Sequence, residues 1–296
     1  MPVKSSIDLR GSRRRSLLIV SLIVVVVLVS SLFVYLSLDK GVVVSEVELR
    51  EAVNNAVGHQ VIKLGTDIVL TETLVIPTNK EITLTSNSDI EFFKLIGADG
   101  ENAITVNGDG LLWLDGVIVT HEGSGSGSGV FVEPDGTFIM VDGEIIGNNG
   151  WRGATGSGGG GGGGVYNCGV FTMLGGVISG NTAAIGGGVL IVPGGVFELK
   201  GGVVTNNVAD YGGGVDTDGT FNMSGGMITN NVATYYGGGV YVNGFFRISS
   251  GEITYNTAVR EGGGVYSGQF GTFNRFGGEI SGNAANVGDD VHQITL

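Results

Sequence analysis

Short runs of alternating apolar and polar residues fill the chain from Val61 onward, and one pattern of them recurs. One copy reads GGGVDTDGTFNMSGGMITNNVA, and the next reads GGGVYVNGFFRISSGEITYNTA. Alternation with a period of two is typical of β-strands that bury one face. Each copy, about 25 residues long, therefore predicts three short strands and three turns, with the Val, Phe, Met and Ile side chains directed inward.

The spacing inside the repeat predicts how the copies assemble. A phenylalanine recurs six times, and an asparagine follows it after ten residues in every copy (Phe138 and Asn148, Phe171 and Asn181, Phe197 and Asn207, Phe221 and Asn231, Phe246 and Asn256, Phe273 and Asn283). The distance from each asparagine to the next strand valine varies, at 17, 8, 8, 9 and 9 residues. A segment of constant length joined by turns of variable length is typical of stacked coils, which accept extra residues only at their corners.

These patterns predict an all-β chain, a parallel β-helix of about nine coils with three strands per coil. Each strand would pair in parallel with its copy in the next coil, so that equivalent side chains stack. The recurrent asparagines would form a ladder at one corner, and the GGG runs would supply positive φ angles at another. We expect this β-helix to occupy residues 61–296.

An apolar run precedes the repeat. Leu17 to Leu38 contains 22 residues and no charge, and as a helix it would span about 33 Å, the thickness of a bilayer core. Three arginines precede it and acidic residues follow it, so the positive-inside rule places residues 1–16 in the cytoplasm and the β-helix outside. A cleaved signal peptide is the alternative, although its apolar region is normally shorter. In both cases we expect the repeat region to be exported, and we favour an uncleaved single-pass transmembrane helix over residues 17–38.

A second helix is predicted within residues 39–60. Ser45 and Glu48 have the spacing of a capping box, and apolar residues follow at helical intervals as far as Val57. We expect a short amphipathic helix that ends near Gly58 and covers the open end of the β-helix.

Composition limits the partners. The net charge is −13, and because residues 1–15 carry +4, the remainder carries −17. Such an acidic body argues against nucleic acid as a partner. Cys168 is the single cysteine, which excludes an intrachain disulfide. Glycine accounts for 57 of 296 residues without a Gly-X-Y period, which favours tight turns over collagen.

The repeat, in the form GGGVY…F-x-M-x-GG-x-I-x-x-N-x-A, resembles right-handed parallel β-helix proteins of the pectate-lyase-like superfamily. It looks more closely like the exported adhesin-like repeat proteins of bacteria and methanogenic archaea. It is also similar to the repeats of chlamydial polymorphic outer membrane proteins, although the phenylalanine motif here is FTM, FEL, FNM, FRI or FNR. The resemblance covers about Gly110 to Val287 and implies a fold that hosts many functions.

Two features are candidates for binding. Alternation directs one column of first-strand residues outward, and it contains four aromatic side chains: Phe131, Tyr166, Tyr241 and Tyr266. Such rings either stack on sugars or stack on one another. Two glycine-rich insertions, Gly123 to Gly129 and Asn149 to Gly164, should project from the same side of the helix. Trp151 and Arg152 are the large side chains of the second insertion and could contact a ligand or partner, or anchor the loop.

The sequence offers little that could carry catalysis. Enzymes on the resembled fold use clustered acids on polysaccharides. The best carboxylate pair here is Asp216 and Asp218, which should share an outward face without a third acid, His or Lys beside them. The three histidines lack zinc-site spacing, so we expect no metal and no cofactor. The sequence therefore favours a membrane-anchored, adhesin-like surface module that binds glycan or protein. A polysaccharide lyase or glycoside hydrolase and a passive envelope spacer are the alternatives.

Overall fold

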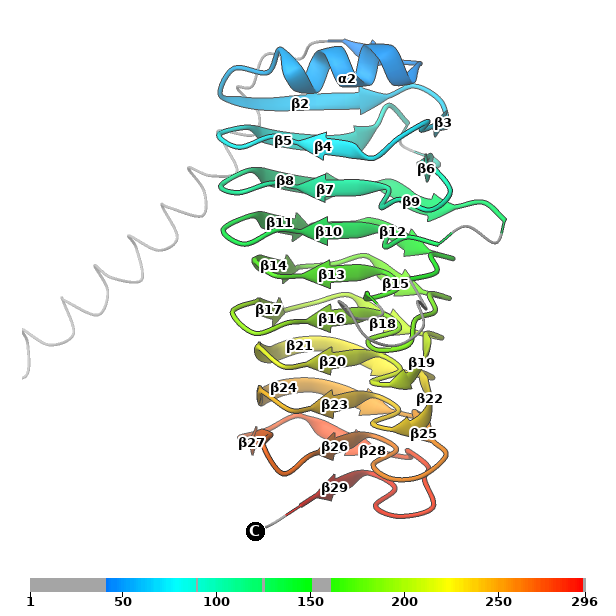
Figure 1. Cartoon of the computed structure of the whole chain (residues 1–296), viewed down its shortest axis with the longest axis vertical. Coiled ribbons are helices and arrows are strands. Elements are labelled where there is room, and N and C mark those ends of the chain that lie inside the picture. The colour runs from blue at the N-terminus through cyan, green and yellow to red at the C-terminus, as the bar shows by residue number, and fades with distance from the viewer. Residues whose placement is uncertain (1–40, 89, 124–125, 151–160, 295–296) are drawn as a thin grey trace, which may run out of the picture. The chain divides into compact units, whose positions relative to one another are not determined.

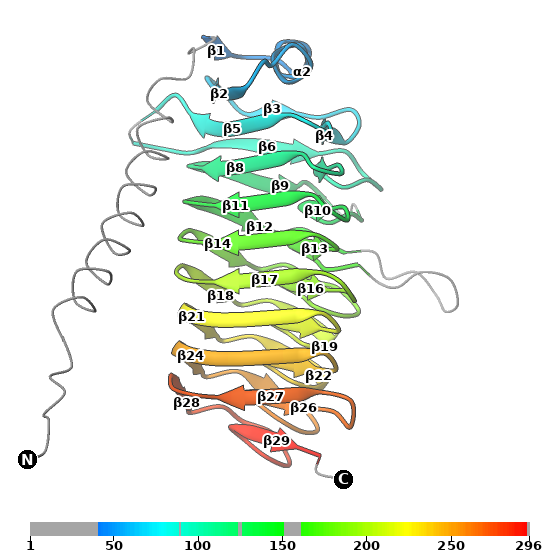
Figure 2. The same cartoon turned by 90° about the vertical axis from the view of Figure 1, so that its left-hand side faces the viewer.

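The repeat region folds as the alternation predicts. A computed structural model describes residues 41–88, 90–123, 126–150 and 161–294, which form a parallel β-solenoid of about nine coils (Figures 1 and 2). Residues 40–296 make one compact unit. The predicted transmembrane segment 17–38 and the basic tail 1–16 lie outside the described residues. Among the residues that are described, no helix is both long and apolar enough to cross a bilayer.

Each coil contributes one strand, or part of a strand, to each of three rows. The first row contains β2 (His59–Leu64), β5 (Glu81–Ser86), β8 (Leu111–Asp115), β11 (Thr137–Met140), β14 (Val170–Met173), β17 (Val196–Leu199), the first parts of β21 (Thr220–Thr229) and β24 (Phe245–Thr254), and β27 (Thr272–Arg275). The second contains β3 (Ile68–Val69), β6 (Phe93–Gly97), β9 (Val117–His121), β12 (Gly143–Ile146), β15 (Val177–Ser179), β18 (Val203–Thr205), the last parts of β21 and β24, and β28 (Glu279–Ser281). The third contains β4 (Leu74–Ile76), β7 (Ile104–Val106), β10 (Val130–Val132), β13 (Val165–Asn167), β16 (Val189–Ile191), β20 (Val215–Thr217), β23 (Val240–Val242), β26 (Val265–Ser267) and β29 (Val291–Gln293).

Two smaller sets of strands complete the solenoid. β19 (Val208–Tyr211), β22 (Val232–Tyr236) and β25 (Thr257–Ala258) form a short sheet between the second and third rows in coils 6–8. β1 (Val42–Val43) pairs with β2 at the N-terminal end. These pairings are parallel, and they are in register apart from local shifts within the β19–β22 and β21–β24 pairs, so each repeat position of the three rows forms a column along the solenoid.

The recurrent phenylalanines form one such column inside the solenoid. Five of them are fully buried: Phe138, Phe171, Phe197, Phe221 and Phe246. Neighbouring rings in this group are parallel to within 11°, with centroids 4.6–5.0 Å apart. Since strand spacing is about 4.8 Å, the in-register pairing itself produces this stack. Phe273 continues the column as a partly buried ring in the last coil.

The predicted asparagine ladder is confirmed. We use this name for Asn148, Asn181, Asn207, Asn231, Asn256 and Asn283. Each ladder Oδ1 from Asn181 onward accepts the backbone N–H and the Nδ2–H of the preceding ladder residue, at 2.9–3.0 Å. Asn283 makes the same two bonds to Oδ1 of Asp290, at 3.1 and 3.0 Å. The ladder satisfies the polar groups at a buried corner, where they would otherwise be unpaired.

The glycine triplets occupy the corner before the third row, as predicted. The first glycine has a positive φ in the triplets that begin at Gly186, Gly212, Gly237 and Gly262, for example 59° at Gly212 and 67° at Gly237. A Cβ on the third glycine would meet backbone, since at Gly214 it would lie 2.6 Å from the carbonyl oxygen of Gly239. The corner therefore requires glycine both for conformation and for close approach between coils.

A helix, α2 (Glu46–Asn54), lies over β2 at the N-terminal end (Figure 1). The Oγ of Ser45 accepts the backbone N–H of Glu48, and Oε2 of Glu48 accepts the backbone N–H of Val44. Leu49 and Val53 are buried and join the core cluster. The helix ends at Asn54, four residues before the predicted end near Gly58. Asparagine competes with helical hydrogen bonding, and Asn55 takes the C-cap conformation there.

Candidate functional site

The outward column of the third row runs the length of the solenoid. Its members in coils 1–9 are Val75, Thr105, Phe131, Tyr166, Leu190, Asp216, Tyr241, Tyr266 and His292. The sequence alignment of the aromatic positions is confirmed, and the structure adds His292 to it. We call these nine residues the outer column.

The C-terminal part of the outer column stacks on itself. The rings of Tyr241 and Tyr266 are 5.3 Å apart and parallel to within 6°, and Tyr266 stacks in the same way on His292 at 5.5 Å. Tyr211 packs its ring edge-to-face with Tyr241, and Tyr236 packs on Tyr266. Tyr266 retains 8% exposure, and burial raises the pKa of Tyr241 to about 12. The ring faces of Tyr241 and Tyr266 are thus occupied by neighbouring rings of the chain.

Asp216 does not share an open face with Asp218, contrary to the expectation from alternation. It is 3% exposed, whereas Asp218 is exposed. The glycine corner folds back onto this strand, so that a Cβ on Gly212 would lie 2.8 Å from the Cβ of Asp216. Burial, together with the charge of Asp218, raises the pKa of Asp216 well above its ordinary value. A carboxyl enclosed in this way has no access to a polymeric substrate.

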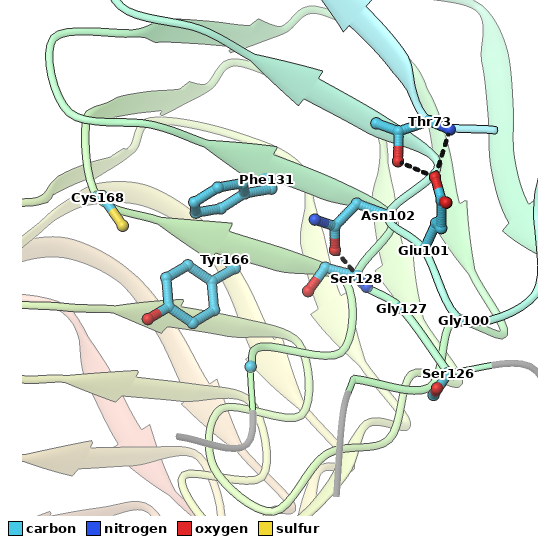
Figure 3. Close-up of a pocket in the computed structure, with 11 residues that line it drawn as sticks. Thr73, Gly100, Glu101, Asn102, Ser126, Gly127, Ser128, Phe131, Tyr166 and Cys168 are labelled. Carbon is cyan, nitrogen blue, oxygen red and sulfur yellow. Dashed lines mark hydrogen bonds between the residues drawn. The ribbon is translucent and has the colours of Figure 1, made fainter. Parts of the chain in front are cut away.

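The N-terminal part of the outer column is different, because a pocket of about 550 Å³ opens beside coils 3 and 4 (Figure 3). Phe131 and Tyr166 of the column line it, with ring centroids 5.2 Å apart in an edge-to-face arrangement. The other lining residues are Thr73, Gly100, Glu101, Asn102, Ser126, Gly127, Ser128, Gly161 and Cys168. Both aromatic side chains are half-buried, so each ring presents part of its surface to the pocket.

One side of the pocket is formed by the turn between β6 and β7, residues 100–102, which we call the pocket wall. The carboxylate of Glu101 accepts the backbone N–H and the hydroxyl of Thr73, at 2.8 and 2.9 Å. These hydrogen bonds, the backbone one first, lower the pKa of Glu101, so the wall carries a negative charge at neutral pH.

Asn102 supplies the wall with an unused donor. Its Oδ1 accepts the backbone N–H of Ser128 at 3.0 Å, which fixes the amide orientation. Its Nδ2 has no hydrogen-bond partner among the described residues and is directed toward the side of Phe131 in the close-up (Figure 3). The hydroxyl of Tyr166 is also without a partner in the described part of the chain. Burial raises the pKa of Tyr166, and the hydroxyl therefore stays protonated as a donor.

Cys168 lies at the rim of the pocket. Burial and the nearby carboxylate of Glu133 raise the pKa of its thiol. Because the thiolate is the nucleophilic form, this environment opposes nucleophilic chemistry. Across the described ranges, no group of three or more His, Cys, Asp and Glu could hold a metal ion. The described lining of the pocket therefore combines aromatic surface with hydrogen-bonding groups.

The two inserted loops meet at this pocket. Ser126 to Ser128 come from the first insertion and Gly161 from the second. Trp151 and Arg152, the predicted contact residues of the second insertion, lie outside the described residues. Of the three predicted tyrosines, Tyr166 lines the pocket, while Tyr241 and Tyr266 belong to the stack in coils 7 and 8.

The sequence analysis missed the pocket wall. Glu101 and Asn102 belong to the irregular early coils, where the repeat provides no alignment, and their contacts are with residues 73 and 128. A short polar turn of this composition carries no local signal for a binding wall. The one signal in the sequence was the pair of glycine-rich insertions at two successive corners, which predicted the side of the solenoid on which the pocket lies.

The fold and the pocket define the protein as a parallel β-solenoid with a pocket on its outer face. No family model matches the chain, and no curated protein and no solved structure is significantly similar to it.

Proposed function

We propose that the protein is an exported surface module, anchored by residues 17–38, that binds a carbohydrate in the pocket of coils 3 and 4. The observation that carries the proposal is the combination of Phe131 and Tyr166 with the free Nδ2 of Asn102 in one open pocket. Sugar rings present apolar C–H faces and hydroxyl edges, and they therefore fit a site that offers aromatic surface together with fixed donors and acceptors.

The charges of the pocket support a neutral or basic sugar over an acidic one. The carboxylate of Glu101 is ionised and can accept hydrogen bonds from sugar hydroxyls, whereas Nδ2 of Asn102 and the hydroxyl of Tyr166 can donate them. None of the lining residues among those described is a Lys or Arg that could pair with an acidic sugar. We therefore expect hexoses or amino sugars to bind in preference to uronic acids.

A glycan array tests the proposal with a matched pair of variants. The full chain in detergent micelles is applied to printed neutral, amino and acidic glycans, and hits are titrated calorimetrically. Tyr166→Ala should weaken binding at least about tenfold, since loss of an aromatic contact in a binding site costs of the order of 1 kcal/mol or more. Tyr241→Ala, at the same repeat position in coil 7, should leave the affinity unchanged. Equal losses in both variants would move the site away from the pocket, and an array without hits would reject a carbohydrate ligand.

The membrane anchor and export require their own test. In a Cys168→Ser background, Ser250→Cys places a single thiol on an exposed position of β24. A membrane-impermeant maleimide should label it in intact cells, and the chain should remain with the membrane after carbonate extraction. Labelling only after lysis would contradict export, and release by carbonate would contradict the anchor.

A further inference from the structure

His121 ends β9 in the third coil, immediately behind the pocket wall. Its side chain is 7% exposed. Its Nδ1 lies 2.8 Å from Oδ1 of Asn148, and its Nε2 lies 2.9 Å from the backbone carbonyl oxygen of Glu101. Both ring nitrogens of a buried histidine therefore face oxygen atoms at hydrogen-bond distance.

Both of those oxygens can only accept. The Glu101 atom is a backbone carbonyl. The amide of Asn148 is oriented by its Nδ2, which donates to Oδ1 of Asn181 at 2.9 Å and to the carbonyl oxygen of Val119 at 3.3 Å. A neutral imidazole has one N–H and would leave one of the two oxygens facing a ring lone pair. The imidazolium has two N–H groups and satisfies both.

The asparagine ladder favours a positive charge at this place. Every ladder amide directs its Oδ1 toward coil 3 and its Nδ2 toward coil 9. Aligned amide dipoles add, as they do along an α-helix, and stabilise a cation at the oxygen end and an anion at the N–H end. Asp290 supplies the anion at the last rung. His121 is the group at the first rung, where a cation is stabilised.

Charged side chains near His121 are mainly acidic. The segments packed around it are β6, the 98–103 turn, the 126–129 loop, residues 147–149 and its own strand. Their charged residues are Lys94, Asp99, Glu101 and Glu122. The carboxylate of Glu101 is turned to Thr73, and no ion pair to His121 occurs in the described part of the chain.

The bond from His121 holds the pocket wall in place. Glu101 is fixed from behind by Nε2 of His121, while Asn102 is fixed from the side by the backbone of Ser128. Gly127 lies against the same contact, since a Cβ placed on it would lie 3.2 Å from Nε2 of His121. Two segments that line the pocket therefore meet at this ring.

We propose that protonation of His121 controls the pocket wall. The doubly protonated ring donates hydrogen bonds to both the pocket wall and the asparagine ladder and so joins them, and loss of a proton releases the wall. The carbohydrate pocket as the target of this control rests on the proposed function, whereas the protonation and the release of the wall do not. Loss of the second ring proton removes one of the two hydrogen bonds. Ligand affinity should fall with it.

Nitrogen-15 NMR of the full chain in micelles, labelled at histidine, tests the protonation directly. The chain has three histidines, and His121→Gln assigns the signal. At pH 7 both ring nitrogens of His121 should show the shifts of protonated nitrogens. His59 serves as the control, because burial lowers its pKa and it should show one bare nitrogen. A bare nitrogen on His121 at pH 7 would overturn the proposal.

Hydrogen exchange tests the release of the wall without any ligand. Protection of the amides of residues 101–103, corrected for intrinsic rates, should fall about tenfold between pH 6 and pH 9, the effect of losing one charged hydrogen bond. His292→Gln should keep this pH dependence, and His121→Gln should abolish it. If His121→Gln does not fold, the wild-type and His292→Gln series still test the proposal, because equal protection at both pH values would reject control of the wall by His121. If the protection of residues 101–103 depends on pH in a chain that binds no glycan, the proposed function is rejected, whereas control of the pocket wall by His121 is supported.

Discussion

Two parts of the outer column have the same repeat position and different environments. In coils 7 and 8, Tyr241 and Tyr266 stack face to face and lie under Tyr211 and Tyr236 of the adjoining short sheet. In coils 3 and 4, Phe131 and Tyr166 border an open pocket. The strands beneath are equivalent in both places, so the corner that precedes each strand decides whether an outward aromatic side chain is covered or available. The difference shows that departures from the repeat, more than the repeat, leave outward side chains open to solvent.

The largest expected effect is a loss of stability when the asparagine ladder is interrupted. Asn207→Ala should destabilise the protein by at least about 3 kcal/mol, since it leaves the backbone N–H and one Nδ2–H of Asn181 without their acceptor in a buried corner. It also removes the Nδ2–H bonds to Oδ1 of Asn231 and to the carbonyl oxygen of Ile178. Chemical denaturation measures the change.

Asn222→Ala is the matched control for the ladder variant. Asn222 is an outward residue that donates one side-chain bond to Glu198, so its loss should cost less than about 1 kcal/mol. A similar cost for both variants would show that the ladder adds little to stability.

Removing one tyrosine from each part of the column tests the comparison itself. Tyr266→Ala should lower stability by about 2–3 kcal/mol, because it removes a buried ring that contacts Tyr236, Tyr241 and His292. Tyr166→Ala should cost less than half as much and act on ligand binding instead. Thermal unfolding measures the loss of stability of both variants, and calorimetric titration measures their ligand affinity. Equal changes of stability and affinity in the two variants would show that the two environments are equivalent.

Asp216, between the two parts, should make stability depend on pH. Because its pKa is raised in the folded state, the folded protein binds the proton more tightly than the unfolded chain. Stability is therefore greatest below the unfolded value near 3.8 and falls as pH rises toward the folded value. Asp216→Asn should remove that fall and stabilise the protein at pH 8 by at least about 1 kcal/mol. Urea unfolding between pH 4 and pH 8 measures it; parallel profiles for both proteins would contradict the burial of the carboxyl.

The smallest expected effect is on the rate at which the thiol of Cys168 is alkylated. Alkylation by N-ethylmaleimide should be slow at pH 7 and rise about tenfold per pH unit, because the raised pKa keeps the thiol protonated. A glycan bound in the pocket should slow the reaction. A rate that is insensitive to pH would argue that the thiol is already ionised, and a rate that is insensitive to bound glycan would separate Cys168 from the site.

Much of the scaffold could be predicted from the sequence. The ten-residue distance from phenylalanine to asparagine, with the period-two alternation, predicted the coil, the inward phenylalanine stack and the ladder, because in-register stacking converts sequence period directly into spatial neighbours. The aromatic members of the outer column were also aligned correctly. Asp216 was placed on the correct side of its strand, but its burial was missed because alternation carries no information about what folds back over a face.

The sequence by itself determined the solenoid: a residue's place in the repeat is enough to identify its neighbours in the coils before and after it, since those contacts are nearest-neighbour and repeat along the axis. Only the tertiary structure decided the exposure of each outward side chain, the meeting of the two inserted loops with the pocket wall, and the position of His121 at the first rung of the ladder. These contacts join irregular segments, and their geometry depends on how corners of unequal length close over the strands. For that reason the aromatic column was visible in the sequence, whereas the pocket beside Phe131 and Tyr166 was not.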